Sequence, residues 1–398
     1  MKLTVWARNN WTIILFSIVS IMLAIFISLH NIESITQSRL ATPEVATLES
    51  SSSLRAIIDN PFYAPFKIVE YVALQFSNNS IFILRSVTAL FGIACIFMFY
   101  RLSSYWYSPL LAWLGTAMFA TSALYLHHAR LAVSSILAPL LLLSLLWAVW
   151  NVRKKNATTV SIFILVTFMI VSLYIPGFIW FGLLILALQR RHLKEFLADI
   201  KLPSVLIGIV IFTILLFPLL RFFILNPNTL LEWAAIPTHL SLKNMAQNII
   251  NVPLSLAVRS NMNPVFNLGR LPYLDLFTIM MTILGTYAFV IRLQLVRTKI
   301  LILSSIICLA LVATEAISIV IFLPVVYLLA TGGIMFLLQQ WYSVFPKNPI
   351  ARVLGLTLLV LVINVSIFYN LNRYFVAWAN NPATADSFQE IVPPNLIQ

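Results

Sequence analysis

Long apolar runs limit what this chain can fold into more than any other feature of its sequence. Eleven stretches are almost free of charge, and each is bounded by charged residues or by Pro and Asn clusters. About 20 apolar residues in helical form cross the hydrocarbon core of a bilayer. The whole chain is 61% apolar and 9% charged, with a mean hydropathy of +0.96, whereas a soluble domain is about 25% charged. The sequence therefore predicts an all-α polytopic membrane protein. The expected spans are 11–29, 80–101, 108–126, 131–150, 158–175, 176–189, 203–225, 272–291, 299–314, 316–340 and 353–370.

The charges between these spans predict an orientation. With eleven spans, one side of the membrane collects 15 of the 25 Lys and Arg residues and only two acids, Glu195 and Asp199, while the other side collects ten of each. Basic residues concentrate in cytoplasmic loops. We therefore expect a cytoplasmic N-terminus, an extracytoplasmic C-terminus and location in the cell membrane. This asymmetry also explains the net charge of +13 without a nucleic-acid partner.

The cysteines and the N-terminal segment narrow the class further. Cys95 and Cys308 both fall within expected spans, where a cysteine behaves as a small hydrophobic residue. They predict no disulfide framework and no metal cluster. The basic start followed by 11–29 has no convincing small-residue cleavage site, so we interpret it as an uncleaved first span.

We expect one integral membrane domain over 1–398, with long extracytoplasmic loops at 31–79 and 226–271 and a short extracytoplasmic tail at 371–398. The first loop predicts amphipathic helices on the membrane surface. One begins after Ser50–Ser53, and the next has its apolar positions at helical spacing: Phe66, Val69, Val72, Ala73 and Phe76. Leu240–Val258 predicts a similar helix in the second loop.

Three arginines lie where the expected spans approach the outer face: Arg85, Arg130 and Arg221. Charges inside spans are costly and need a reason. One interpretation is that each side chain reaches toward lipid phosphates at the interface. The other is a pocket for an anionic headgroup, because the guanidinium group matches phosphate oxygens.

Other polar and aromatic residues accompany these arginines. His127 and His128 precede Arg130. Adjacent histidines point in different directions on a helix, so they are a weak indication of a metal site. We interpret them instead as hydrogen-bond donors to a phosphate or a sugar hydroxyl. Glu315, in the outer turn between two spans, is either solvated or paired with an outer arginine. The aromatic residues of the outer segments fit an interfacial belt as well as a sugar-binding platform: Tyr63, Tyr71, Trp233 and Tyr273.

The first loop carries five acids: Glu33, Glu44, Glu49, Asp59 and Glu70. We interpret Glu33, Glu49 and Glu70 as solvated. Glu44 differs, because it follows Pro43 close to the end of the first span, at the depth of the outer arginines. A carboxylate there could take a proton from an acceptor hydroxyl or amine, so Glu44 is the candidate catalytic base.

Four features in chain order resemble the polyprenyl-phosphate-dependent membrane glycosyltransferases of the C-type fold, which include the protein O-mannosyltransferases of glycosyltransferase family 39 and the aminoarabinose transferases of lipid A. An acidic site comes first, at Pro43-Glu44. The Pro-aromatic segment 60–65, the second-span Arg85 and the pair Ala129-Arg130 follow. The resemblance covers about residues 5–190 and continues afterwards only as topology.

The resemblance implies a sugar donor on an isoprenoid phosphate, inverting displacement at the outer face, a loop acid as general base, and arginines on the leaving phosphate. Carried to this sequence, Glu44 becomes the base or its neighbour, and Arg85 and Arg130 organise the site. The family's Asp-Glu pair is incomplete here, because Pro43 stands before Glu44. Asp59 is then the reserve candidate for the base.

Three functions stay open at this point. The first is a glycosyltransferase acting on an envelope glycan or protein acceptor. The second is a catalytically inactive relative that binds a lipid-linked glycan or scaffolds an envelope assembly, which the missing Asp favours. The third is a transporter or flippase, which the near absence of acids within the spans disfavours. The expected partners are the bilayer, a polyprenyl-phosphate-linked sugar and its acceptor. The sequence requires no cofactor and leaves a divalent metal open.

Overall fold

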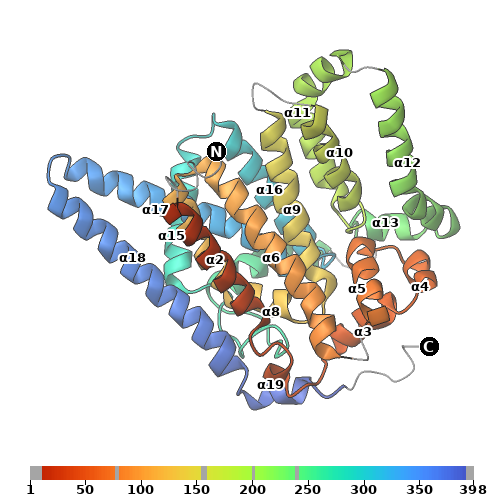
Figure 1. Ribbon diagram of the computed structural model, residues 1–398, viewed down its shortest axis with the longest axis horizontal. Helices are drawn as coiled ribbons and strands as arrows, with labels where there is room; N and C mark the ends of the chain where they lie inside the picture. The colour runs from red at the N-terminus through yellow and green to blue at the C-terminus, as the bar shows by residue number, and fades with distance from the viewer. Residues whose placement is uncertain (1–10, 77–79, 154–158, 200–201, 238–241, 391–398) are drawn as a thin grey trace.

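The computed structural model describes residues 11–76, 80–153, 159–199, 202–237 and 242–390 (Figure 1). Within these ranges the regular structure is helical, apart from one isolated β-bridge between Leu40 and Glu390. The all-α class expected from the apolar runs is confirmed.

The described helices cover most of these ranges. The α-helices are α2 (Trp11–Leu29), α3 (Thr42–Ser51), α4 (Leu54–Asp59), α5 (Ala64–Phe76), α6 (Ile81–Trp106), α7 (Pro109–Thr121), α8 (Ala123–Arg130), α9 (Leu137–Val152), α10 (Thr159–Ser172), α11 (Ile179–Asp199), α12 (Leu202–Leu225), α13 (Thr229–Trp233), α14 (Leu242–Ala257), α15 (Leu276–Val290), α16 (Val296–Ala313), α17 (Phe322–Val344), α18 (Pro349–Asn372) and α19 (Pro382–Ser387). Short 3-10 helices occupy Ser34–Thr36 (η1), Ser134–Ile136 (η2) and Ile319–Ile321 (η3), and a π-helix, η4, extends α18 over Arg373–Trp378.

Each of the eleven expected spans coincides with a helix or, in one case, with the pair α7 and α8. Among the described residues, six helices are long and apolar enough to cross a membrane, or seven if the pair is one span bent by 63°. The remaining four expected spans correspond to shorter apolar helices: Val160–Ser172, Ile179–Leu188, Phe212–Leu225 and Leu276–Val290. Multiple membrane spans are thus supported, and the number eleven stays a prediction.

The core of the bundle lies where α6, α7, α9 and α17 meet, and aromatic rings fill much of it. Phe99 of α6 and Phe119 of α7 stack with ring centroids 4.6 Å apart, and Tyr327 of α17 meets Phe119 edge-on. α15 and α17 approach still more closely, with Gly285 and Gly333 at their contact. The helices α3 to α5 attach to this bundle through α6.

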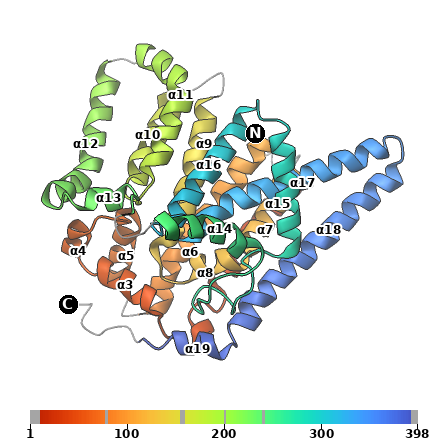
Figure 2. The same cartoon turned by 180° about the vertical axis from the view of Figure 1, so that it is seen from behind.

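The outer segments expected in the first loop gather at one end of the bundle, together with α8 and α19 (lower part of Figure 1). α4 begins as expected after Ser53, whose hydroxyl accepts a hydrogen bond from the Ala56 N–H at 3.1 Å. The same arrangement is seen from behind in Figure 2. α14 confirms the helix expected at Leu240–Val258.

α5 confirms the second expected helix, and its position at the membrane surface stays a prediction. Val69, Val72 and Phe76 are exposed, as a helix lying at the membrane surface requires. Phe66 is instead buried, with its ring centroid 5.3 Å from that of Phe91. The buried face of α5 also carries Lys67 and Glu70, so the prediction that Glu70 is solvated was wrong.

Two boundaries also differ from the sequence-based expectation. α11 continues through Arg190, Arg191 and Lys194, where a basic loop was expected, because a helix can leave the bilayer without ending there. The last span continues as η4 to Trp378, so helix replaces the first part of the expected tail. The expectations for 1–10, 77–79, 154–158, 200–201, 238–241 and 391–398 lie outside the described residues.

Candidate functional site

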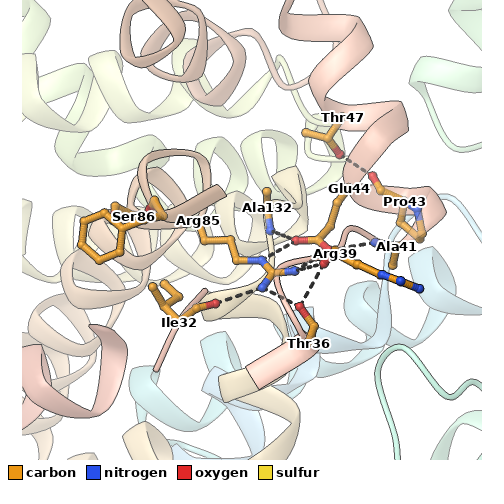
Figure 3. A network of polar contacts seen from close by, with 11 residues as sticks. Ile32, Thr36, Arg39, Ala41, Pro43, Glu44, Thr47, Arg85, Ser86 and Ala132 are labelled. Atoms are coloured by element: carbon orange, nitrogen blue, oxygen red, sulfur yellow. Dashed lines mark hydrogen bonds and ion pairs between the residues drawn. The ribbon is translucent and has the colours of Figure 1, made fainter. Parts of the chain in front are cut away.

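Glu44 and Arg85 form a bidentate ion pair that joins α3 to α6 (Figure 3). Arg85 Nε donates to Glu44 Oε1 at 2.9 Å, and Arg85 Nη2 donates to Glu44 Oε2 at 3.0 Å. Both side chains have 0% exposure. The structure thus brings together two residues that the sequence singled out independently, 41 positions apart.

Every hydrogen-bonding position of this pair is occupied. The two remaining acceptor positions of Glu44 take the backbone N–H groups of Ala132, at 2.9 Å from Oε1, and Ala41, at 3.0 Å from Oε2. The other three N–H groups of Arg85 reach the Ile32 carbonyl, the Thr36 hydroxyl and the Arg39 carbonyl, all at 2.8–2.9 Å. A carboxylate offers about four lone-pair sites and a guanidinium five donors. In this arrangement Glu44 has no free lone pair for an acceptor's proton.

The local sequence places Glu44 in this position through the start of α3. Ala41 is the extended residue before the helix, and Pro43 occupies the first turn, where its missing N–H costs no hydrogen bond. Glu44 is the third helical residue and reaches back to the Ala41 N–H, as the acid of a capping box does. Glu44 therefore caps the helix and neutralises Arg85 at the same time.

Arg130 lies at the end of α8 and is also buried, but among different partners. Its Nη1 donates to the Ile27 carbonyl at 2.9 Å, and its Nη2 donates to the His30 carbonyl. The guanidinium carbon sits 5.2 Å from the ring centre of Tyr374 and 4.6 Å from that of Phe375. The Arg130 Nε–H has no hydrogen-bond partner among the described residues, so one buried donor of this cation is unused.

The residues around Arg130 add further polar atoms without partners. The His127 ring meets the rings of Tyr374 and Trp378 edge-on, at 4.9 and 4.6 Å. Within the described residues His127 Nδ1 and the Tyr374 hydroxyl are buried without hydrogen bonds. Both come from the same stacked cluster, formed by α8 and η4. This cluster can accept an additional polar group only if its packing opens.

Arg373, the first residue of η4, is a buried cation that the sequence analysis assigned to the tail. Its Nη1 donates to the Pro272 carbonyl at 2.7 Å, its Nη2 donates to Asn267 Oδ1, and its Nε has no partner among the described residues. Arg130 and Arg373 both lie within electrostatic range of His127. Within the described ranges neither arginine forms an ion pair with an acid. We call Arg130, His127, Arg373 and Tyr374 the buried basic cluster.

His128 points away from this cluster, which separates the two histidines as their adjacent positions predicted. Its Nδ1 lies 2.7 Å from the Ser135 hydroxyl, and its ring stacks on Phe266 with centroids 4.5 Å apart. No group of three His, Cys, Asp or Glu residues suited to a metal ion occurs within the described ranges.

The remaining candidates lie apart from the Glu44–Arg85 pair. Arg221 is exposed on α12, and Asp59 is exposed at the end of α4, 3.8 Å from Arg55. Tyr63 lies at the α4–α5 corner, where its N–H donates to the Tyr174 carbonyl at 2.8 Å and burial raises its pKa to about 12. The structure therefore does not bring Arg221, Asp59 or Tyr63 into one site with Glu44.

Trp233, Tyr273 and Glu315 each have local hydrogen-bond partners. Trp233 donates from its indole nitrogen to the Leu173 carbonyl at 2.7 Å, and Tyr273 is buried. Glu315 is exposed and accepts a hydrogen bond from Asn248 at 3.0 Å. In this arrangement Glu315 is partnered by an amide of α14 and not by an outer arginine.

Glu70 is a buried ionisable group that was expected from the sequence to be solvated. Its Oε2 accepts a 2.5 Å hydrogen bond from the Ser51 hydroxyl, and its Oε1 has no partner in the described part of the chain. Burial, with a smaller contribution from the charge of Glu44, raises the pKa of Glu70 from 4.5 to about 7, against the opposing effects of the Ser51 bond and of Lys67. Lys67, one turn away, donates to the Asn60 carbonyl, and burial lowers its pKa to about 8.

This raised pKa predicts a pH dependence of stability. The folded protein holds the Glu70 proton up to about pH 7, whereas the unfolded chain releases it near its ordinary pKa. Stability is therefore highest at low pH and falls as the pH rises between these two values. We expect Glu70→Gln to match the wild type at pH 5 and to be more stable by about 1–3 kcal/mol at pH 7.5.

Thermal unfolding of the purified protein at several pH values between 5 and 7.5 tests this prediction. Lys67 stays mostly charged in this pH range. Glu49→Gln is the matched control, because Glu49 is an exposed acid on α3. Parallel pH profiles for the wild type and Glu70→Gln would contradict the prediction.

Comparison with known proteins gives a limited result. No protein-family model matches the chain, and no curated protein matches it. Among solved structures, the fold is similar to the crystal structure of ArnT from Cupriavidus metallidurans in the apo state. The TM-score is 0.47 and the identity 14%, over 97% of this chain and 78% of that one. A similarity of this degree assigns neither family nor activity to the chain.

Proposed function

We propose that this protein is a membrane glycosyltransferase that takes a sugar from a polyprenyl-phosphate donor and passes it to a cell-envelope or protein acceptor at the extracytoplasmic face. One observation carries the proposal. Two of the four sequence features that resemble the C-type glycosyltransferases are directly paired, Glu44 with Arg85, and the third, Ala129-Arg130, lies next to them. Ala132, two residues after Arg130, donates to Glu44, and Arg130 lies within electrostatic range of Arg85.

The buried basic cluster supports the phosphate part of the proposal. Arg130 and Arg373 are both buried, and neither forms an ion pair within the described ranges, although the buried Asp275 lies within electrostatic range of Arg373. Each of the two arginines keeps an unused Nε–H. Burying an unpaired charge is costly. A lipid phosphate that reaches this cluster after its packing opens would supply negative charge and accept hydrogen bonds from these arginines.

A second candidate function is binding of a lipid-linked glycan without turnover. The saturated hydrogen bonding of Glu44 favours it, because a general base needs a free lone pair within reach of the acceptor. Glu44 could act as a base only after exchange of at least one of its four partners. The two functions share the donor and differ in whether sugar is released.

Both functions predict that Arg130 contributes to donor binding. We expect Arg130→Gln to weaken the binding of a polyprenyl-phosphate sugar about 10- to 100-fold, the effect of losing one or two charge-assisted hydrogen bonds. Arg221→Gln is the matched control, because Arg221 is exposed on α12, a helix that lies apart from α8 and α18 in both views (Figures 1 and 2). It should change affinity less than twofold. Binding is measured on protein in lipid nanodiscs, with folding checked by thermal unfolding.

Turnover separates the two candidates. Wild-type protein incubated with a panel of labelled polyprenyl-phosphate sugars and envelope acceptors should release polyprenyl phosphate if the protein is a transferase. Binding without release across the panel would support the non-catalytic candidate. Absence of both binding and release, or equal loss with Arg221→Gln, would contradict the proposed donor.

A further inference from the structure

The outward face of α18 carries a regular stripe that the rest of the protein leaves uncovered. Its positions alternate in steps of four and three residues: Ile350, Leu354, Thr357, Leu361, Asn364 and Phe368. All six are exposed, while Leu359, Ile363, Ser366 and Asn370 on the opposite face are buried. Steps of four and three are the repeat by which two helices pack along a common seam. α18 and the end of α17 also extend beyond the bundle in both views (Figures 1 and 2).

Asn364 is a residue of this stripe whose side-chain amide cannot form hydrogen bonds with lipid tails. The apolar span runs from Pro349 to Trp378, so Asn364 lies fifteen residues from one end and fourteen from the other. Its Nδ2 donates to the Val360 carbonyl of its own helix at 2.9 Å. In the described structure this leaves Oδ1 and the second N–H of the amide facing outward near the middle of the bilayer, where hydrocarbon offers no hydrogen bond.

We propose that this face of α18 binds a second copy of the same chain, with Asn364 of one copy hydrogen-bonded to Asn364 of the other. An amide is both donor and acceptor, so it is complementary to itself. Two copies related by a two-fold axis along the membrane normal place their Asn364 residues at the same depth. Thr357, seven residues earlier, then lies in the same seam. An Asn at one such position fixes the register of paired helices.

Cysteine cross-linking tests the interface directly. The two native cysteines, Cys95 and Cys308, are buried and provide a low background. In full-length protein reconstituted at high lipid-to-protein ratio, Leu361→Cys should form a disulfide between copies on mild oxidation. Val362→Cys is the matched control, because Val362 is exposed on the same helix but about 100° around it. We expect at least fivefold less cross-linking at Val362.

The contribution of Asn364 is tested by Asn364→Leu, which keeps an apolar surface. Single-molecule photobleaching in liposomes should show dimers for the wild type. For Asn364→Leu we expect the dissociation constant of the dimer to rise about threefold to thirtyfold, the range expected for hydrogen bonds between membrane helices. Unchanged dimerisation, equal cross-linking at Leu361 and Val362, or monomers alone for the wild type at every lipid ratio would each overturn the proposal.

Discussion

Glu44→Gln should destabilise the folded protein by about 3–5 kcal/mol, the effect expected when one partner of a buried ion pair loses its charge. The amide cannot accept all four hydrogen bonds that now reach Glu44, because its nitrogen is a donor. It would also leave the Arg85 charge buried without compensation. The expected result is a clearly lower thermal midpoint and less folded protein after purification.

Arg85→Gln should have an effect of similar size, and the double variant should lose less than the sum of the two single losses. Residues in one network usually show interaction energies of about 0.5–3 kcal/mol in such a cycle. Glu49→Gln, an exposed change on the same helix, should be within about 0.5 kcal/mol of the wild type.

This cycle also bears on the catalytic role that the sequence suggested for Glu44. If Glu44 mainly stabilises the fold, then the Glu44→Gln molecules that still fold should keep their activity or lipid binding per folded molecule. A Glu44→Gln protein with normal stability and no turnover would instead show that Glu44 is the base. Normal stability in both single variants would exclude the structural role.

Much of the fold could be predicted because its main determinant is local. Twenty apolar residues in a row specify a helix without any knowledge of its neighbours, and each expected span has a helical counterpart. Ser53 before an apolar pattern likewise predicts a helix start from a few adjacent residues. The span boundaries were less certain, because hydropathy does not indicate where α11 or α18 stops being helical.

The candidate site depends on distant contacts, and these were only partly predictable. Glu44 and Arg85 could be selected because a charge in an apolar setting needs a partner. The sequence could not predict that every hydrogen-bonding position of both side chains is occupied. That occupancy depends on backbone groups such as the Ala132 N–H. Every residue except proline has a backbone N–H, so the sequence does not indicate which of them reach Glu44. Arg373 was missed because its burial follows from the continuation of α18 as η4. Glu70 was missed because the expected apolar face of α5 ran through Val69, Val72 and Phe76, which are exposed, whereas Glu70 lies on the buried face with Phe66 and Leu74.

Gly285→Ala should be as damaging as loss of the ion pair, although it adds a single methyl group. A Cβ at Gly285 would lie 1.8 Å from the Leu329 carbonyl oxygen and 3.0 Å from the Gly333 nitrogen. Both contacts are with backbone, so no side-chain rotation can relieve them and the two helices must move apart. Small residues allow such close approach of membrane helices. We expect a loss of about 3 kcal/mol or more, at the upper end of the range for overpacked sites.

Gly333→Ala should behave in the same way, because its Cβ would lie 2.1 Å from the Met281 carbonyl oxygen. Gly182→Ala is the matched control: it is also a glycine inside an apolar helix, but its nearest neighbour would be the Met169 methyl group at 3.8 Å. Ala favours helix over Gly by about 1 kcal/mol, so this control should be neutral or slightly stabilising. Thermal unfolding of the three variants separates the effects. If all three behave alike, then the losses reflect general sensitivity of the bundle and not the close approach of α15 to α17.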